Sequence, residues 1–139
     1  MATEVSASLN VRAHENLGDI LERQGRTNEA IRHYTEALAI RLDFADAHNN
    51  LAPALRHRGR LEEASTHHHE ALRLAPTAAE FHDNLGSTLA RQGRLHEAVG
   101  AYRAALRVNS GFTLAGQNLE CSVRQRGPAS RPPVPGTMP

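Results

Sequence analysis

Residues 16–34 read NLGDILERQGRTNEAIRHY, residues 50–68 read NLAPALRHRGRLEEASTHH, and residues 84–102 read NLGSTLARQGRLHEAVGAY. Each stretch starts 34 residues after the one before it, and the asparagine that opens it returns once more at Asn118. A fixed period of this length is typical of stacked helix–turn–helix repeats. The sequence therefore divides into three full blocks and a partial fourth: residues 11–44, 45–78, 79–112 and 113–126.

Apolar residues within each block recur at spacings of three and four, which is the pattern of amphipathic helices. Each block holds two such segments, separated by a Gly-Arg pair that begins at Gly25, Gly59 or Gly93. Glycine tolerates the left-handed backbone conformation that ends a helix, so these glycines mark turns. A capping-box pattern at Thr77 and Glu80 predicts the start of the fifth helix. We expect helices near residues 12–24, 27–40, 46–57, 61–74, 78–92, 95–108 and 113–125.

The repeated positions resemble the tetratricopeptide repeat (TPR) family. The resemblance rests on the Leu-Gly pair at Leu17, the turn glycines, the Glu-Ala pair at Glu29, the aromatic rings of Tyr34 and Tyr102, and Pro76 at the end of a block. It implies an all-α, right-handed α-solenoid whose first helices line a concave groove for an extended peptide. The repeats look similar to the arrays of O-linked N-acetylglucosamine transferase, in which an asparagine ladder binds peptides.

We expect three regions along the chain. Residues 1–10 form a short N-terminal extension, residues 11–126 form the repeat domain, and residues 127–139 form a disordered, proline-rich tail. The partial block supplies a capping helix, because stacked repeats leave their last apolar face uncovered. The first ten residues carry no remnant of a further repeat, which we interpret as evidence against a cut from the middle of a longer array.

The second block departs from its neighbours at two positions. Pro53 lies inside its first helix, where proline removes a hydrogen bond and costs about 3 kcal/mol or more unless the bend is useful. We therefore expect a kink in mid-helix, which is either tolerated or re-aims the binding face. His68 stands where the other blocks carry Tyr34 and Tyr102.

Polar residues occupy the side of each first helix that lies opposite its leucines. Asparagine suits a peptide groove because its amide offers donors and an acceptor to a peptide unit. The opposing interpretation is that asparagine is a solvated polar residue that fits this repeat. Acids lie early and arginines late on these helices, which complements the helix dipole, borders the groove with charge, or does both. The candidate peptide-binding residues are Asn16, Asn50, Asn84, Asn118, Asp19, Asn49, Asp83, Arg23 and Arg91.

A clamp for a peptide's C-terminal carboxylate is another binding mode of TPR domains. Members of that kind carry Lys and Asn, then Asn, then Lys and Arg on successive first helices. The corresponding residues here are Glu15 and Asp19, then Asn50, then Glu80 and Asn84, and only Asn50 fits. We therefore favour recognition of the peptide main chain. Replacing Asn50 and Asn84 by alanine should then weaken peptide binding and leave thermal stability almost unchanged.

Nine histidines raise the question of a metal site. His14, His48 and His82 are one repeat apart, and such side chains project in parallel, roughly 8–10 Å apart, without converging on one ion. The three histidines of residues 67–69 fan out around a helix and do not face one metal together. We expect no metal ligands, and we expect His14, His48 and His82 to pack between paired helices.

Composition narrows the class of protein. A net charge of +1 gives no electrostatic case for nucleic acid or a membrane surface, and no apolar run is long enough to span a membrane. The single cysteine, Cys121, excludes an intrachain disulfide. No nucleophile motif or phosphate-binding loop is present, so we expect no enzymatic activity and no cofactor. The favoured function is a cytoplasmic adaptor with a protein or peptide partner. The alternatives are a weakly self-associating scaffold and a short form of a larger TPR-containing enzyme.

Overall fold

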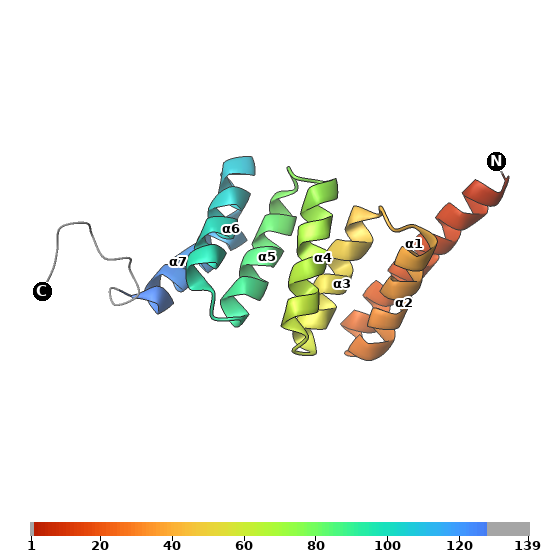
Figure 1. Cartoon of the computed structure of the whole chain (residues 1–139), viewed down its shortest axis with the longest axis horizontal. Coiled ribbons are helices and arrows are strands. Elements are labelled where there is room, and N and C mark those ends of the chain that lie inside the picture. The colour runs from red at the N-terminus through yellow and green to blue at the C-terminus, as the bar shows by residue number, and fades with distance from the viewer. Residues whose placement is uncertain (1, 128–139) are drawn as a thin grey trace, which may run out of the picture.

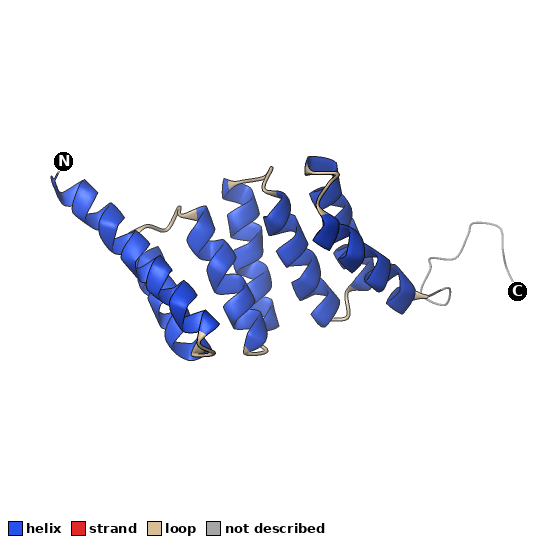
Figure 2. Cartoon of the chain, turned by 180° about the vertical axis from the view of Figure 1, so that it is seen from behind, coloured by secondary structure: helices blue, strands red, loops and turns tan. Residues whose placement is uncertain are grey.

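The computed structural model describes residues 2–127, in which seven α-helices follow one another without a strand (Figures 1 and 2). The helices pack in the pairs α1–α2, α3–α4 and α5–α6, and α7 packs against α6. The protein is thus an all-α helical-repeat solenoid, as predicted. Its helices are α1 (Ala2–Arg23), α2 (Thr27–Ile40), α3 (Ala45–His57), α4 (Leu61–Leu74), α5 (Ala79–Arg91), α6 (Leu95–Val108) and α7 (Thr113–Arg126).

Helices α2 to α7 begin and end within one residue of their predicted bounds. Helix α1 differs, because it begins at Ala2 rather than near residue 12 and so includes the predicted N-terminal extension. That stretch lacks the repeat pattern but contains no glycine or proline to end a helix. The capping box is wrong, since α5 follows Ala78 and no side chain caps it. The predicted disordered tail, from residue 128 onward, lies outside the described residues.

One backbone motif closes the turn inside every repeat. Gly25, Gly59 and Gly93 have positive φ angles of 76°, 77° and 79°, as the sequence predicted. The amide of Arg26 donates to the carbonyl of Leu21 over 2.8 Å, and the other two turns repeat this bond. Each turn glycine also donates to the carbonyl three residues before it. Together the two bonds cap the last carbonyls of the first helix and reverse the chain.

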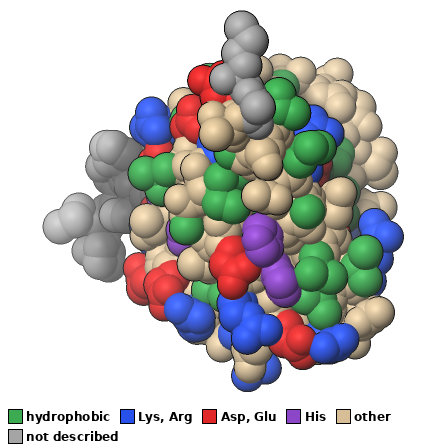
Figure 3. Space-filling view, turned by 90° about the vertical axis from the view of Figure 1, so that its right-hand side faces the viewer, with side chains coloured by type: hydrophobic (Ala, Val, Ile, Leu, Met, Phe, Trp, Pro, Cys, Tyr) green, Lys and Arg blue, Asp and Glu red, His purple; other side chains and the backbone are tan. Residues whose placement is uncertain are grey.

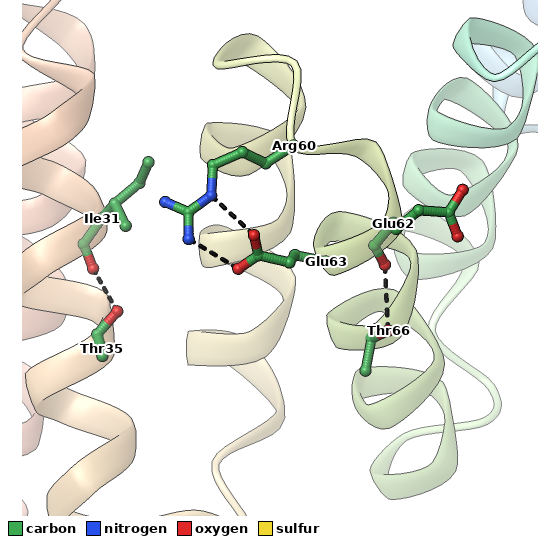
Figure 4. Close-up of polar contacts among 6 residues, drawn as sticks. All are labelled: Ile31, Thr35, Arg60, Glu62, Glu63 and Thr66. Carbon is green, nitrogen blue, oxygen red and sulfur yellow. Dashed lines mark hydrogen bonds and ion pairs between the residues drawn. The ribbon is translucent and has the colours of Figure 1, made fainter.

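The arginine after each turn glycine lies at the start of the second helix. Arg26, Arg60 and Arg94 each pair with the glutamate three residues later. Figure 4 shows the pair of Arg60 and Glu63, whose two hydrogen bonds measure 2.9 and 2.7 Å. This pairing holds the pKa of the Glu63 carboxyl below its ordinary value. The same figure shows two threonine hydroxyls that donate to the carbonyl one turn earlier, Thr35 to Ile31 and Thr66 to Glu62.

Small residues let the paired helices approach closely. The second helices bury alanines at matching positions, among them Ala30, Ala64 and Ala98, with no exposed surface. Tyr34 packs directly over Gly18, where an added Cβ would lie 2.5 Å from the Cε1 atom of the ring. Tyr102 packs over Gly86 with the same 2.5 Å separation. The Leu-Gly signature is therefore a requirement of ring packing rather than of backbone conformation.

The second repeat packs a smaller ring against a larger neighbour. Ala52 stands where the other repeats have Gly18 and Gly86, and His68 stands in place of the tyrosine. Both residues are completely buried. An imidazole is shorter than a phenol, which leaves room for the alanine methyl group.

Pro53 is a third position at which the second repeat differs from the other two, next to Ala52. In the first repeat the Tyr34 hydroxyl donates to Asp19 Oδ1 over 2.6 Å, and the third repeat has a corresponding tyrosine–serine bond. Pro53 occupies the acceptor position in the second repeat, where His68 instead contacts the Thr88 hydroxyl over 2.9 Å. No tyrosine hydroxyl needs an acceptor there, so proline is permitted. Helix α3 continues across it to His57.

The first helices form the inner layer of the stack. Helix α1 contacts α3, α3 contacts α5, and α5 contacts α7, in addition to the contacts within pairs. Helices that touch their next-but-one neighbours lie on the shorter, inner side of a curved stack. The polar residues of the first helices therefore share one face. No helix in the described range combines the length and apolar character needed to cross a membrane.

Candidate peptide-binding groove

A cavity of about 570 Å³ opens between the first two repeats and α5. Two further hollows, each about 330 Å³, share residues with it. Arg23 lines the first and the hollow toward α1, while Asn84 lines the first and the hollow toward α7. The three hollows thus form a discontinuous groove along the first helices. The main cavity is lined by Arg23, Asn49, Asn50, Pro53, His57 and Asn84, among others.

The groove brings most of the predicted site residues together. Four of them line the main cavity, and Asn16, Asp19 and Asp83 line the two flanking hollows. Arg91 is exposed at the end of α5, and Asn118 is half-buried on α7. These two residues line none of the three hollows.

The asparagines also connect one repeat to the next, which sequence reasoning missed. Each side-chain amide donates to the residue that precedes the asparagine of the previous repeat. The spacing of 35 residues was visible in the sequence, but a period alone does not say which atoms meet. The bonds are Asn50 Nδ2 to Glu15 Oε1 (3.0 Å), Asn84 Nδ2 to Asn49 Oδ1 (3.0 Å) and Asn118 Nδ2 to Asp83 Oδ1 (2.9 Å).

These bonds alter both earlier interpretations of the asparagines. The residues are neither merely solvated nor reserved for a ligand. Each amide uses one N–H for its neighbour, and the described hydrogen bonds leave its Oδ1 atom and second N–H available. Asn84→Ala would leave the buried Asn49 oxygen without this donor, so the expectation of unchanged stability no longer holds for Asn84. Asn16 is exposed and has no such bond to any described residue.

Buried charge lies beneath the groove. Asp83 is 3% exposed, and burial raises the pKa of its carboxyl. The Arg56 guanidinium is half-buried and donates to the backbone carbonyl of Asn84 over 3.3 Å. Its positive charge acts against the rise in the pKa of Asp83. Arg56 was predicted only as part of a basic rim, and its backbone bond instead helps to hold α3 against α5.

The early part of the groove is acidic. Burial raises the pKa of the Glu15 carboxyl, and the nearby carboxylates of Asp46 and Asp19 raise it further. The late part carries the exposed guanidinium of Arg23, together with His57, whose Nδ1 lies 3.6 Å from Glu22 Oε2. Charge therefore changes along the groove, as the sequence predicted.

Pro53 has a consequence for the groove as well as for packing. Proline has no N–H, so the backbone carbonyl of Asn49, four residues earlier, lacks its usual helix donor. Both residues line the main cavity. Asn49 is only 4% exposed, so this carbonyl lies in the wall of the cavity rather than on its open surface.

Comparison with known families agrees with the repeat geometry. A model described as tetratricopeptide repeat matches residues 43–110, and one described as TPR repeat matches residues 18–55. The chain belongs to the tetratricopeptide-repeat family. This confirms the resemblance drawn from the Leu-Gly and turn-glycine positions. A comparison of this TPR protein with curated proteins found no match.

Several solved TPR structures share the fold. The first TPR of Spaghetti (RPAP3), bound to the HSP90 peptide SRMEEVD, has a TM-score of 0.81 at 19% identity, over 85% of this chain and 94% of its own. The Sgt2 TPR domain from Aspergillus fumigatus has a TM-score of 0.82 at 22% identity, over 92% and 88%. A Thermobaculum terrenum O-GlcNAc transferase mutant gives 0.80 at 22% identity, over 84% of this chain and 22% of the transferase. At these identities the likeness establishes the fold.

Proposed function

We propose that this TPR protein is a non-catalytic interaction module that binds an extended peptide in the groove along its first helices. The observation that carries the proposal is the main cavity, in which Asn50 and Asn84 recur at the repeat spacing. The Spaghetti TPR of the same fold was solved with a peptide bound, which supports a peptide as the class of ligand.

The asparagines recognise the peptide main chain in this proposal. Their Oδ1 atoms accept from peptide N–H groups, and their second N–H groups donate to peptide carbonyls. Each such bond contributes about 1 kcal/mol net, so the dissociation constant is on the order of micromolar or weaker unless apolar anchors add to it.

Charge in the groove disfavours strongly acidic peptides. Asp19 and Glu80 line hollows of the groove, and the Glu15 carboxyl lies close to the carboxylates of Asp19 and Asp46. A peptide such as SRMEEVD would bring its own carboxylates close to them, at a Coulombic cost. We expect peptides without a strong net charge to bind better.

N-methylated peptides test main-chain recognition. A peptide selected on this protein from a random library would be resynthesised with alternate backbone nitrogens methylated, which removes their hydrogen bonds. We expect one alternate set to lower affinity about fivefold or more in a fluorescence-anisotropy titration, whereas alanine replacement of most peptide side chains has little effect. Failure to select any peptide would contradict the proposed function. A selected peptide that depends only on its side chains would contradict the asparagine mechanism alone.

Weak self-association as a scaffold is a second candidate. Val5 and Leu9, one turn apart on α1, are 61% and 64% exposed, and Leu42 is 74% exposed. Figure 3 shows several hydrophobic side chains on the N-terminal end of the molecule. Such a surface is a candidate contact between copies. Sedimentation at several concentrations would show a rising mass, and a strict monomer would exclude this role.

A further inference from the structure

Two pairs of histidines lie between the helices of the first two repeats. His14 Nδ1 is 3.1 Å from His33 Nδ1, and the rings are stacked with centroids 5.4 Å apart. His48 and His67 repeat the arrangement, with their Nδ1 atoms 2.9 Å apart. Packing of His14 and His48 between paired helices agrees with the sequence prediction. The partners, however, are 19 residues apart within one repeat, whereas His14, His48 and His82, which were expected not to converge on one ion, lie in different repeats.

A carboxylate completes the first pair. Glu36 Oε2 lies 3.2 Å from His14 Nδ1 and 3.8 Å from His33 Nδ1. His33 and Glu36 are three residues apart, so they share one face of α2, and His14 meets them from α1. The three donor atoms all lie within 4.8 Å of one another.

We propose that His14, His33 and Glu36 bind a zinc ion. Zinc takes imidazole nitrogen and carboxylate oxygen at about 2.0–2.2 Å in tetrahedral geometry, which separates neighbouring ligand atoms by about 3.3–3.5 Å. The donor atoms of the three residues are 3.1, 3.2 and 3.8 Å apart, so two distances lie just below this range and one lies just above it. Three protein ligands leave the fourth position to water or to a donor from another molecule.

The first repeat suits a metal better than the second. Glu70 corresponds to the first repeat's carboxylate, but the Arg73 guanidinium holds it and lowers its pKa. The first repeat has Ala39 at the position of Arg73, so Glu36 has no such competitor. The third repeat has alanine in place of both second-helix ligands.

The first triad is also more accessible to a metal ion from solvent than the histidine pair of the second repeat. The side chains of His14 and Glu36 are 30% and 48% exposed, whereas His48 is 3% exposed and its Nε2 contacts the Leu42 carbonyl over 2.9 Å. Figure 3 shows histidine side chains beside an acidic side chain on the solvent-facing N-terminal end. A zinc ion reaches the first triad without any rearrangement of the helices.

Bound zinc would connect α1 to α2, and this predicts a measurable effect on stability. A ligand that binds the folded chain alone stabilises it by an amount that grows with the logarithm of the ligand concentration relative to the dissociation constant, and so raises the melting temperature. Zinc titrated into tag-free protein should therefore bind with 1:1 stoichiometry in calorimetry and raise the melting temperature. Cobalt(II) in its place should give the visible absorption of a tetrahedral nitrogen and oxygen site.

Substitutions at equivalent positions of the first and second repeats test whether zinc binds at His14, His33 and Glu36. Glu36→Gln and His33→Ala should each weaken zinc binding about tenfold or more and remove the cobalt spectrum. Glu70→Gln, at the same position of the second repeat, should leave both unchanged. Circular dichroism without metal checks that each variant is folded. The proposal is overturned if the wild-type chain binds no zinc, or if Glu36→Gln and His33→Ala bind it as well as wild type. The latter result would mean adventitious binding elsewhere, for example at residues 67–69.

Discussion

Tyr34 and Tyr102 lie over glycines that have no space for a side chain. The glycine positions in the repeat are not equivalent, however. Gly86 would place a Cβ 2.5 Å from the Tyr102 ring, whereas a Cβ at Gly100, in α6, would meet nothing within 4 Å. Alanine at Gly86 would clash with a ring, whereas alanine at Gly100 would change only the helix propensity of α6.

We expect Gly86→Ala to destabilise the protein by about 1–3 kcal/mol, since the ring must move. Gly100→Ala is the matched control and should stabilise it by about 0.5–1 kcal/mol, because alanine has the higher helix propensity. Chemical denaturation of both variants measures these changes. A Gly86→Ala protein as stable as the Gly100→Ala protein would contradict the proposed ring packing.

His68 makes the stability of the protein depend on pH. Burial, together with the nearby positive groups of Arg56, His69 and His67, lowers the pKa of its imidazole to about 3. Between about pH 6.5, the ordinary value for histidine, and pH 3, the unfolded chain binds a proton at this residue and the folded chain does not. The contribution of neutral His68 to stability is therefore present above about pH 6.5 and is lost as pH falls through this window.

We expect the free energy of unfolding of wild type to fall more steeply below pH 6.5 than that of His68→Gln, by roughly 5 kcal/mol at most. His69→Gln, which replaces an exposed neighbour, should keep the wild-type slope. Carboxyls with raised pKa values, such as those of Glu15 and Asp83, are present in all three proteins. Parallel denaturation profiles for wild type and His68→Gln would show that His68 is not the buried neutral group.

At the scale of the helix pair, the second repeat exchanges three residues together. Ala52, Pro53 and His68 replace a glycine, a hydrogen-bond acceptor and a tyrosine. Residues that share one packing site have coupled effects on stability.

We expect His68→Tyr alone to destabilise the protein, because the ring meets the Ala52 methyl and its hydroxyl finds no acceptor. Adding Ala52→Gly and Pro53→Ser restores the set used by the third repeat and should recover stability beyond the sum of the separate changes. A thermodynamic cycle of these variants measures the coupling. Additive effects would mean that the three exchanges are independent.

The helical elements could be predicted from sequence because the period fixes their register. Six of the seven helices lie within one residue of expectation. The early part of α1 could not be predicted this way, because residues 2–10 carry no repeat pattern, although they contain no glycine or proline to end the helix. The relation between Pro53 and His68 could not be predicted for another reason. In the other repeats a tyrosine hydroxyl donates to the position of Pro53, and the second repeat has no tyrosine there.

For the whole molecule, hollows lie along the first helices, where the sequence predicted a groove, but the hydrogen bonds between the asparagines of successive repeats were not foreseen. Asn50 and Asn84 connect neighbouring repeats and also line the main cavity. Replacing either of them would therefore change both the stability of the protein and its affinity for a peptide. The histidine triad was missed because spacing within a repeat depends on how two helices face each other, which the period does not reveal. The sequence therefore predicted the helices and their polar faces, but not which side-chain atoms meet across two helices.

Asn16 offers the cleanest test of the groove, because it is exposed on α1, lines a hollow and has no bond to another described repeat. Asn28 is the matched control, an exposed asparagine on the second helix of the same repeat. The decisive measurement is the affinity of a selected peptide for Asn16→Ala and Asn28→Ala, at equal melting temperatures. We expect Asn16→Ala to bind about fivefold more weakly and Asn28→Ala to bind as wild type does. Equal affinity of the two variants would contradict peptide binding through the asparagines of the groove.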